Sequence, residues 1–293
     1  MKNIKFLLMS MVAAVLVSCG TTSTVPITGR KQNLMVSDGE MLSLSTQQYQ
    51  EFMKTAKLST DATKTAMVKR VGQNLANAVV SYLNANGMQN DVQNYKWQFN
   101  LVADKQANAW CMPGGLIVVY EGLLPITQDE ASLAIVLGHE IAHAVARHSA
   151  EQMSTQIKQQ YGIQGVGALA SVLGVGTNTI SLGQAMASAG LNLAILKYSR
   201  NHESEADYMG LIFAAMAGYN PEAAVTFWQR MASASTSNTS EFLSDHPSDA
   251  TRIKNIQGWL PEAKKYYKPK TTTTAKKTTT TKKTTTKKTT KKK

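Results

Sequence analysis

The sequence predicts an α+β fold in which most of the chain is helical and a small sheet lies near the centre. Two observations carry this prediction. Apolar residues recur at three- and four-residue spacing on both sides of the middle of the chain, which is typical of amphipathic helices. In residues 95–120 the pattern changes to alternation, as in "YKWQFNL", and then to a short apolar run, "LIVVY", and both patterns are typical of strands.

Caps and periodicity place the elements in the first half of the chain. Asp38 can cap one helix, and Asp61 can cap a second that ends near Gly87. "YKWQFNLVAD" then predicts a half-buried strand, "NAWCM" a second short strand and "LIVVY" a third, after the turn "PGG". Asp129 can cap a long helix that includes residues 137–153.

The second half begins with an uncharged segment. Residues 159–196 are rich in Gly, Ala and Leu, but polar residues interrupt them too often for a membrane span, so we expect a helical hairpin or lid. "YSRNHESEADYMGLIFAAMAG" predicts a helix that ends at Gly218, and the dipeptide "NP" begins the next. After the loop "STSNTS", a last helix is expected to run to about Trp259.

The N-terminus has the pattern of an export signal. Lys2 and Lys5 precede an apolar run that is too short to span a bilayer. The run ends in "LVSC", which resembles the lipobox of bacterial lipoproteins, where the cysteine is acylated. We therefore predict a signal peptide over residues 1–18, a lipid anchor on Cys19 and a tether over residues 19–36.

The C-terminal tail accounts for the basic character of the chain. The formal net charge is +12, and residues 268–293 hold eleven lysines and no acid, so the predicted domain at residues 37–262 is close to neutral. We expect residues 263–293 to form a disordered tail that can contact anionic lipid or wall polymer. Nucleic acid is excluded as a partner, because the chain is exported and its lysine-rich stretch has no aromatic residue for base stacking.

Residues 137–153, "LGHEIAHAVARHSAEQM", predict a metal site. His139 and His143 are four residues apart, so they lie on one face of a helix, and Glu140 lies beside that face, where it can take a proton from a metal-activated water. The helix is mostly apolar and therefore buried, where unpartnered histidines are costly unless a cation holds them. We predict one Zn²⁺ here, whereas His148 is expected to face elsewhere with a structural role.

A catalytic zinc usually has three protein ligands, so a third is needed. The acidic cluster "HESEAD" is the best source. Glu203 and Asp207 share a helix face, whereas Glu205 points away. One of the two carboxylates can bind the metal while the other orients an imidazole, and the spacing leaves open which does which.

The sequence resembles the zinc metallopeptidases related to the CaaX prenyl protease, in particular their soluble periplasmic lipoprotein branch. The similarity covers about residues 26–260 and follows the family's order with "TGRKQ", "NAWCMPGG", "LGHEIAHAVARHSAEQM", "YSRNHESEAD" and "HPSDATRI". It implies a mostly helical, zincin-like (gluzincin) metallopeptidase domain. It also implies that His139, His143 and Glu203 bind the zinc, that Glu140 is the general base and that Asp207 supports a ligand imidazole.

The resemblance further places His246 and Arg252 near the open side of the metal. There they would stabilise an oxyanion, or His246 would itself bind zinc and exclude water. An edge strand that contains Asn108, Ala109 and Trp110 would pair with an extended substrate. Trp110 stands where phenylalanine is common in the family, a change that could alter the shape of a subsite.

These observations predict a lipid-anchored zinc endopeptidase that hydrolyses proteins of the cell envelope. Neither Gly20 nor the "TTST" that follows Cys19 is acidic, which favours the periplasmic face of the outer membrane. The alternative is a chaperone-like factor for envelope protein assembly or quality control, with a self-inhibited zinc site.

Overall fold

The computed structural model describes residues 21–161, 192–234, 242, 246 and 250–269. The predicted signal peptide, Cys19, most of the uncharged segment, the "STSNTS" loop and the lysine-rich stretch lie outside these residues.

The described part of the chain is mostly helical. Its helices are α2 (Asp38–Thr55), α3 (Ala62–Ala85), α4 (Gln89–Val92), α5 (Leu124–Thr127), α6 (Glu130–Val145), α7 (His148–Tyr161), α10 (Arg200–Met216), α11 (Ala223–Ala234) and α13 (Ala250–Tyr266), with the 3-10 turns η1 (Glu121–Leu123) and η2 (Leu193–Ile195). Its strands are β1 (Thr21–Thr24), β2 (Lys31–Leu34), β3 (Gln98–Val102), β4 (Ala109–Met112) and β5 (Leu116–Tyr120). None of these helices combines the length and apolar character needed to cross a membrane. The combination of many helices with a few strands confirms the predicted α+β class.

The predicted capping residues are correct for α3 and α6 but not for α2. Asp61 and Asp129 accept hydrogen bonds from the first turns of α3 and α6. Ser37, not Asp38, caps α2, in a capping box with Glu40. The short helix α4 and the turns η1 and η2 have too few residues to show a helical period, and the sequence did not predict them.

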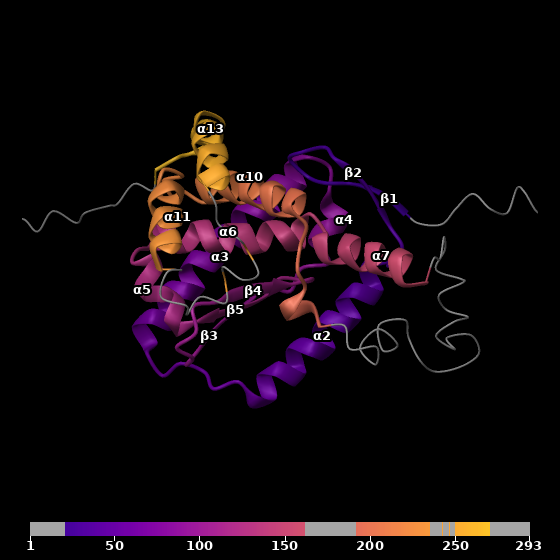
Figure 1. The fold of residues 1–293 in the computed structure, drawn as a ribbon, viewed down its shortest axis with the longest axis horizontal. Coiled ribbons are helices and arrows are strands. Elements are labelled where there is room, and N and C mark those ends of the chain that lie inside the picture. Colours follow the sequence, from indigo (N-terminus) through magenta and orange to yellow (C-terminus); the bar gives the residue numbers. More distant parts are fainter. Residues whose placement is uncertain (1–20, 162–191, 235–241, 243–245, 247–249, 270–293) are drawn as a thin grey trace, which may run out of the picture.

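Residues 21–34, expected to belong to a tether, form an antiparallel sheet in which β1 pairs with β2. Val25 and Leu34 are buried, and β2 packs against α7 (Figure 1). A Thr-rich composition gives no sign of this packing, because the contacts are made with residues far along the chain. The hairpin is therefore part of the folded domain.

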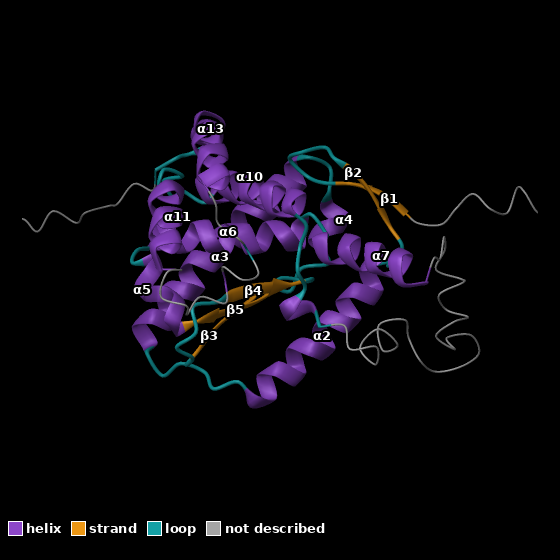
Figure 2. Ribbon diagram, in the orientation of Figure 1, coloured by secondary structure: helices purple, strands orange, loops and turns teal. Residues whose placement is uncertain are grey.

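The central sheet positions the edge strand beside the site. Its order is β3-β5-β4, with β3 parallel to β5 and β4 antiparallel to it, so β4 lies at an edge. Helix α6 runs through the middle of the molecule with the sheet on one side and α10 on the other, and both contact it (Figure 2). The layers bury α6 almost completely, which explains its apolar composition.

Two glycines bring α6 and α10 into backbone contact. A Cβ on Gly138 would lie 2.7 Å from the carbonyl oxygen of Gly210, and a Cβ on Gly210 would lie 2.6 Å from the backbone nitrogen of His139. Both distances are too short for any side chain, so the helices can cross this closely only where both residues are glycine. The crossing lies next to the first histidine of the predicted site.

The long helix expected through residues 137–153 is divided in two. Helix α6 ends at Val145, and Arg147 adopts a positive φ of 56°, so α7 begins in a new direction. This conformation costs a non-glycine residue roughly 1–2 kcal/mol. The Arg147 guanidinium lies 2.8 Å from Asp38 and 2.9 Å from Asp91, and these ion pairs offset the strain.

Candidate active site

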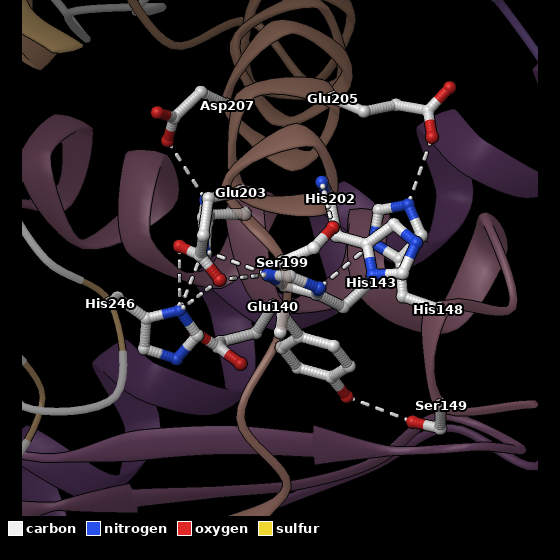
Figure 3. Close-up of polar contacts among 12 residues, drawn as sticks. Glu140, His143, His148, Ser149, Ser199, His202, Glu203, Glu205, Asp207 and His246 are labelled. Atoms are coloured by element: carbon white, nitrogen blue, oxygen red, sulfur yellow. Dashed lines mark hydrogen bonds and ion pairs between the residues drawn. The ribbon is translucent and has the colours of Figure 1, made fainter. Parts of the chain in front are cut away.

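Four buried side chains direct one donor atom each toward the same point. They are Nε2 of His139 and of His143, Nδ1 of His246 and a carboxylate oxygen of Glu203. Helix α6 supplies the first two, α10 supplies Glu203, and His246 lies between α11 and α13 in the sequence. Figure 3 shows His246 and Glu203 facing each other beside Glu140. The structure thus brings together residues that are up to 107 positions apart.

Most separations of these atoms are close to those expected in a tetrahedral metal site, and all are within 4.8 Å. The two Nε2 atoms are 3.0 Å apart, and His246 Nδ1 lies 3.1 Å from His139 Nε2 and 3.0 Å from Glu203 Oε2. Oε2 of Glu203 lies 3.4 Å from Nε2 of His139, and Oε1 of Glu203 lies 3.4 Å from Nε2 of His143. Zinc–ligand bonds of about 2.0–2.1 Å place the corners of a tetrahedron roughly 3.3 Å apart, within the observed range.

The hydrogen bonds on the outer side of the histidines explain why a cation is needed. His139 Nδ1 lies 2.9 Å from Asp207, which as a carboxylate can only accept, so this nitrogen carries the proton and Nε2 presents a lone pair. His143 Nδ1 has its own outer partner, His148, at 2.9 Å. Facing lone pairs of nitrogen in a buried site repel each other unless a positive ion lies between them, so these residues fit a bound metal.

The electrostatics of Glu203 and His143 favour the protonation states that bind a metal. Burial opposes ionisation of Glu203, but His246 and the two α6 imidazoles outweigh it and hold the pKa of this carboxyl well below its usual range. Burial lowers the pKa of His143 well below its usual value, so its imidazole is neutral. An ionised carboxylate and a neutral imidazole are ligand forms that a divalent ion requires. At His139 burial is outweighed by the hydrogen bonds to Asp207 and Glu203, which raise the pKa of the imidazole, so a proton competes with a metal ion for this ligand.

Glu140 lies beside the cluster, as the helix geometry predicts. Its side chain is 3 % exposed, and its Oε1 lies 3.5 Å from Nε2 of His246. The carboxylate is therefore next to the point where the four donor atoms meet without being one of them. This is the place a general base needs if it is to reach a water held at that point.

Asp207 and Arg252 form a buried pair behind His139. Arg252 Nη2 lies 2.6 Å from Asp207, and its guanidinium lies 3.5 Å from the centre of the Trp228 ring. Arg252 also donates to the backbone carbonyl of His246 at 3.2 Å. Arg252 Nη1 also lies 3.6 Å from Oε2 of Glu203, so the guanidinium contacts Asp207, the His246 loop and one carboxylate of the cluster.

The sequence did not predict the part played by His148 and Glu205. His148 was expected to face elsewhere, but it is fully buried and contacts His143, because the turn at Arg147 redirects α7. Glu205 does leave α10 on the side opposite Asp207 (Figure 3), yet it is also buried and lies 3.0 Å from His148. Burial lowers the pKa of His148 to about 4, which keeps this imidazole neutral at neutral pH.

The edge strand lies next to α6, with its side chains on two faces. Ala109 packs in the core that contains α6, whereas Trp110 packs against Tyr49 and Phe52 of α2. Trp110 therefore points away from the site. A change at this position could alter the shape of a subsite only indirectly, through the packing of β4. Asn108 precedes β4 and accepts a backbone hydrogen bond from Tyr120.

The segment before α10 also approaches the site. Turn η2 contacts β4, and Leu193 is buried in the same cluster as Trp110. The Tyr198 ring stacks on His143 with centroids 4.0 Å apart, while its hydroxyl lies 2.8 Å from Ser149 Oγ. In this conformation, residues 193–198 therefore lie beside both the edge strand and a ligand histidine.

Comparisons with known proteins find similarity to metalloendopeptidases. The chain is 38 % identical over 172 residues to "Mitochondrial metalloendopeptidase OMA1" of Schizosaccharomyces pombe, which covers 58 % of this chain and 48 % of that protein. It is 31 % identical over 248 residues to "Metalloendopeptidase OMA1, mitochondrial" of Bos taurus, covering 82 % of this chain and 46 % of that protein.

A bacterial protein is also similar. The chain is 25 % identical over 242 residues to "Beta-barrel assembly-enhancing protease" of Escherichia coli, covering 81 % of this chain and 47 % of that protein. The chain thus spans about half the length of each of these relatives. The profile of "Peptidase family M48" matches residues 62–260, which include the predicted metal ligands, and so the chain belongs to peptidase family M48.

Proposed function

We propose that this chain is a zinc-dependent endopeptidase held at the cell envelope by an N-terminal lipid. The observation that carries the proposal is the set of four buried donor atoms within 4.8 Å of one another, with Glu140 beside them. Two imidazoles from an H-E-x-x-H helix and a glutamate from a second helix form the ligand set of a catalytic zinc. Names of relatives in two groups contain "metalloendopeptidase" or "protease", which supports the same chemistry.

We assign a separate role in peptide hydrolysis to each of the residues Glu140, Asp207 and Arg252. When bound, zinc supplies Lewis acidity, which polarises the scissile carbonyl and makes a water more acidic. Glu140 takes the proton of the attacking water and passes it to the leaving amine. Asp207 holds His139 through Nδ1, and Arg252 holds Asp207, so we assign Arg252 to positioning rather than to the oxyanion role expected from the resemblance.

The substrate is proposed to bind as an extended strand along β4. An edge strand offers backbone groups for pairing, and β4 lies against the helix that carries the histidines. Extended pairing recognises the main chain, which suits an enzyme that cleaves many sequences. The lipobox-like N-terminus and the bacterial relative's name favour proteins of the envelope as substrates and the periplasmic face of the outer membrane as the location.

His246 is proposed to close the site in the resting enzyme. Its Nδ1 is the fourth donor atom of the cluster, and as a ligand it would take the position that a catalytic zinc normally leaves open for water. The chaperone-like alternative also uses a closed site. The names of the relatives favour a peptidase that opens over one that never cleaves.

The His246→Ala variant tests both the function and the closure. We expect it to keep its zinc, since His139, His143 and Glu203 remain, and to cleave casein several-fold faster than the wild type. Metal analysis and casein digestion of the full chain measure the two quantities.

A loss of turnover of about 100-fold in this variant would instead assign His246 to the oxyanion. If neither the wild type nor the variant contains zinc or cleaves casein, the chain is not a zinc endopeptidase.

The lipid anchor is tested by Cys19→Ala. We expect this variant to leave the membrane fraction in high salt, because the acyl chain on Cys19 is the proposed attachment and none of the described helices can span a bilayer. Binding that persists only at low salt would come from the lysine-rich stretch 268–293, whose attraction to anionic lipid is screened by ions. Retention of the variant in high salt would contradict the lipid anchor.

A further inference from the structure

A chain of polar contacts runs from His143 to the N-terminal hairpin. His143 Nδ1 lies 2.9 Å from Nδ1 of His148, whose Nε2 lies 3.0 Å from Glu205. Glu205 in turn accepts from Arg30 Nε at 2.8 Å and from the Thr28 hydroxyl at 2.5 Å. Thr28 and Arg30 belong to the turn between β1 and β2, so the chain of contacts joins the hairpin, α10 and α7 to a predicted ligand on α6.

The direction of each hydrogen bond follows from the residue types. Glu205 forms an ion pair with the Arg30 guanidinium and accepts from the Thr28 hydroxyl, so it is present as a carboxylate, which can only accept. His148 therefore donates from Nε2, and in a neutral imidazole Nδ1 is then the acceptor. His143 must donate from its own Nδ1, which leaves a lone pair on Nε2, directed at the metal position.

The contacts also fix the plane of the His148 ring. His148 is fully buried and stacks on His202, with centroids 4.5 Å apart and an interplanar angle of 17°. His202 lies 3.2 Å from Glu151, which Arg30 holds through two bonds of 2.7 and 2.8 Å. Arg30 thus bridges the carboxylates beside both stacked rings, and His148 cannot turn without breaking several buried contacts.

We propose that Arg30, Glu205 and His148 are positioning residues for the metal site, setting the tautomer and orientation of His143 as Asp207 does for His139. This inference rests on the proposed function, since it assumes a metal at the cluster. It assigns a role to the hairpin, which brings Arg30 and Thr28 to Glu205 across 175 and 177 positions of sequence. Partners of this kind that lie behind a ligand typically change metal affinity by about 10–100-fold.

The test compares two substitutions of His148 that separate hydrogen bonding from packing. Asn can place its amide oxygen near the position of Nδ1 and still accept from His143, whereas Leu fills the ring's volume but accepts nothing. We expect His148→Leu to weaken zinc binding by about 10–100-fold and His148→Asn to weaken it less. Competition with a chromophoric chelator gives the zinc affinity, and the visible absorption of the cobalt-loaded protein reports the ligand geometry.

A second test changes Arg30 in the partly exposed hairpin, where a substitution puts folding less at risk. Arg30→Met should weaken zinc binding by about tenfold. Arg70→Met is the matched control. Arg70 lies on α3 and forms a surface ion pair with Glu130, the first residue of α6, away from the cluster. Melting temperatures of the metal-free proteins separate loss of metal affinity from loss of stability.

The possible outcomes distinguish this inference from the function it rests on. If His148→Leu binds zinc as tightly as His148→Asn, with the cobalt spectrum unchanged, His148 only fills space and the inference is wrong. It is also wrong if Arg30→Met and Arg70→Met bind zinc equally well. A wild-type protein that binds no zinc overturns the proposed function instead, and this inference with it.

Discussion

Glu140→Gln is expected to abolish peptide hydrolysis while leaving the metal content unchanged. The amide has nearly the same shape as the carboxylate but cannot accept a proton at neutral pH. Because Glu140 lies beside the four donor atoms and is not one of them, the metal ligands stay intact. Loss of a general base typically lowers the rate by about 10²–10⁴-fold.

The measurement needs an open site, so Glu140→Gln should be assayed alone and combined with His246→Ala. Casein digestion and metal analysis are performed on the same samples. Glu140→Asp is the matched control: it keeps the carboxylate but withdraws it by one methylene, and it should retain part of the activity. Cleavage by Glu140→Gln at the wild-type rate would show that another group takes the proton.

Glu203→Ala is expected to lower the zinc affinity by more than about 100-fold, beyond the loss typical of groups that only support a ligand. Glu203 is the carboxylate of the cluster, and without it three neutral imidazoles remain to hold a dication. Since metal binding contributes to folding, the melting temperature should also fall, and added zinc should restore it only in part.

The control for this variant must be another glutamate with no link to the metal. The sequence pointed to Glu205, but its contact with His148 makes it unsuitable. Glu222, on the surface beside Lys264, is a better choice. If Glu203→Ala keeps its zinc while Glu222→Ala behaves like the wild type, a different residue is the third ligand.

The parts of the site that could be predicted from sequence are those set by helix geometry. His139 and His143 lie four residues apart, so any helix brings them to one face, and Glu203 and Asp207 share a face for the same reason. The capping residue Asp129 and the short strand at "NAWCM" could also be predicted, because caps and strand patterns act over a few residues. The position of this strand at the sheet edge was implied by the family resemblance.

The parts that could not be predicted depend on a change in chain direction or on distant pairing. In a continuous helix, His148 would point away from His143. The helix ends near Arg147 without a glycine or proline that would predict the break from the sequence. The positive φ is held by ion pairs with Asp38 and Asp91, far away in the sequence. The bond between Arg30 and Glu205 likewise spans 175 positions, so no local pattern could reveal it.

The contact between Gly138 and Gly210 has a consequence for ion selectivity. The two helices touch through their backbones next to His139, so the distance from the histidines of α6 to Glu203 on α10 is set by main chain and cannot easily grow. Calcium needs six to eight oxygen ligands at about 2.3–2.6 Å, and this nitrogen-rich cavity would have to expand to admit it. We therefore expect the crossing to limit the size of the site, so that a small four-coordinate ion binds in preference to the larger calcium ion.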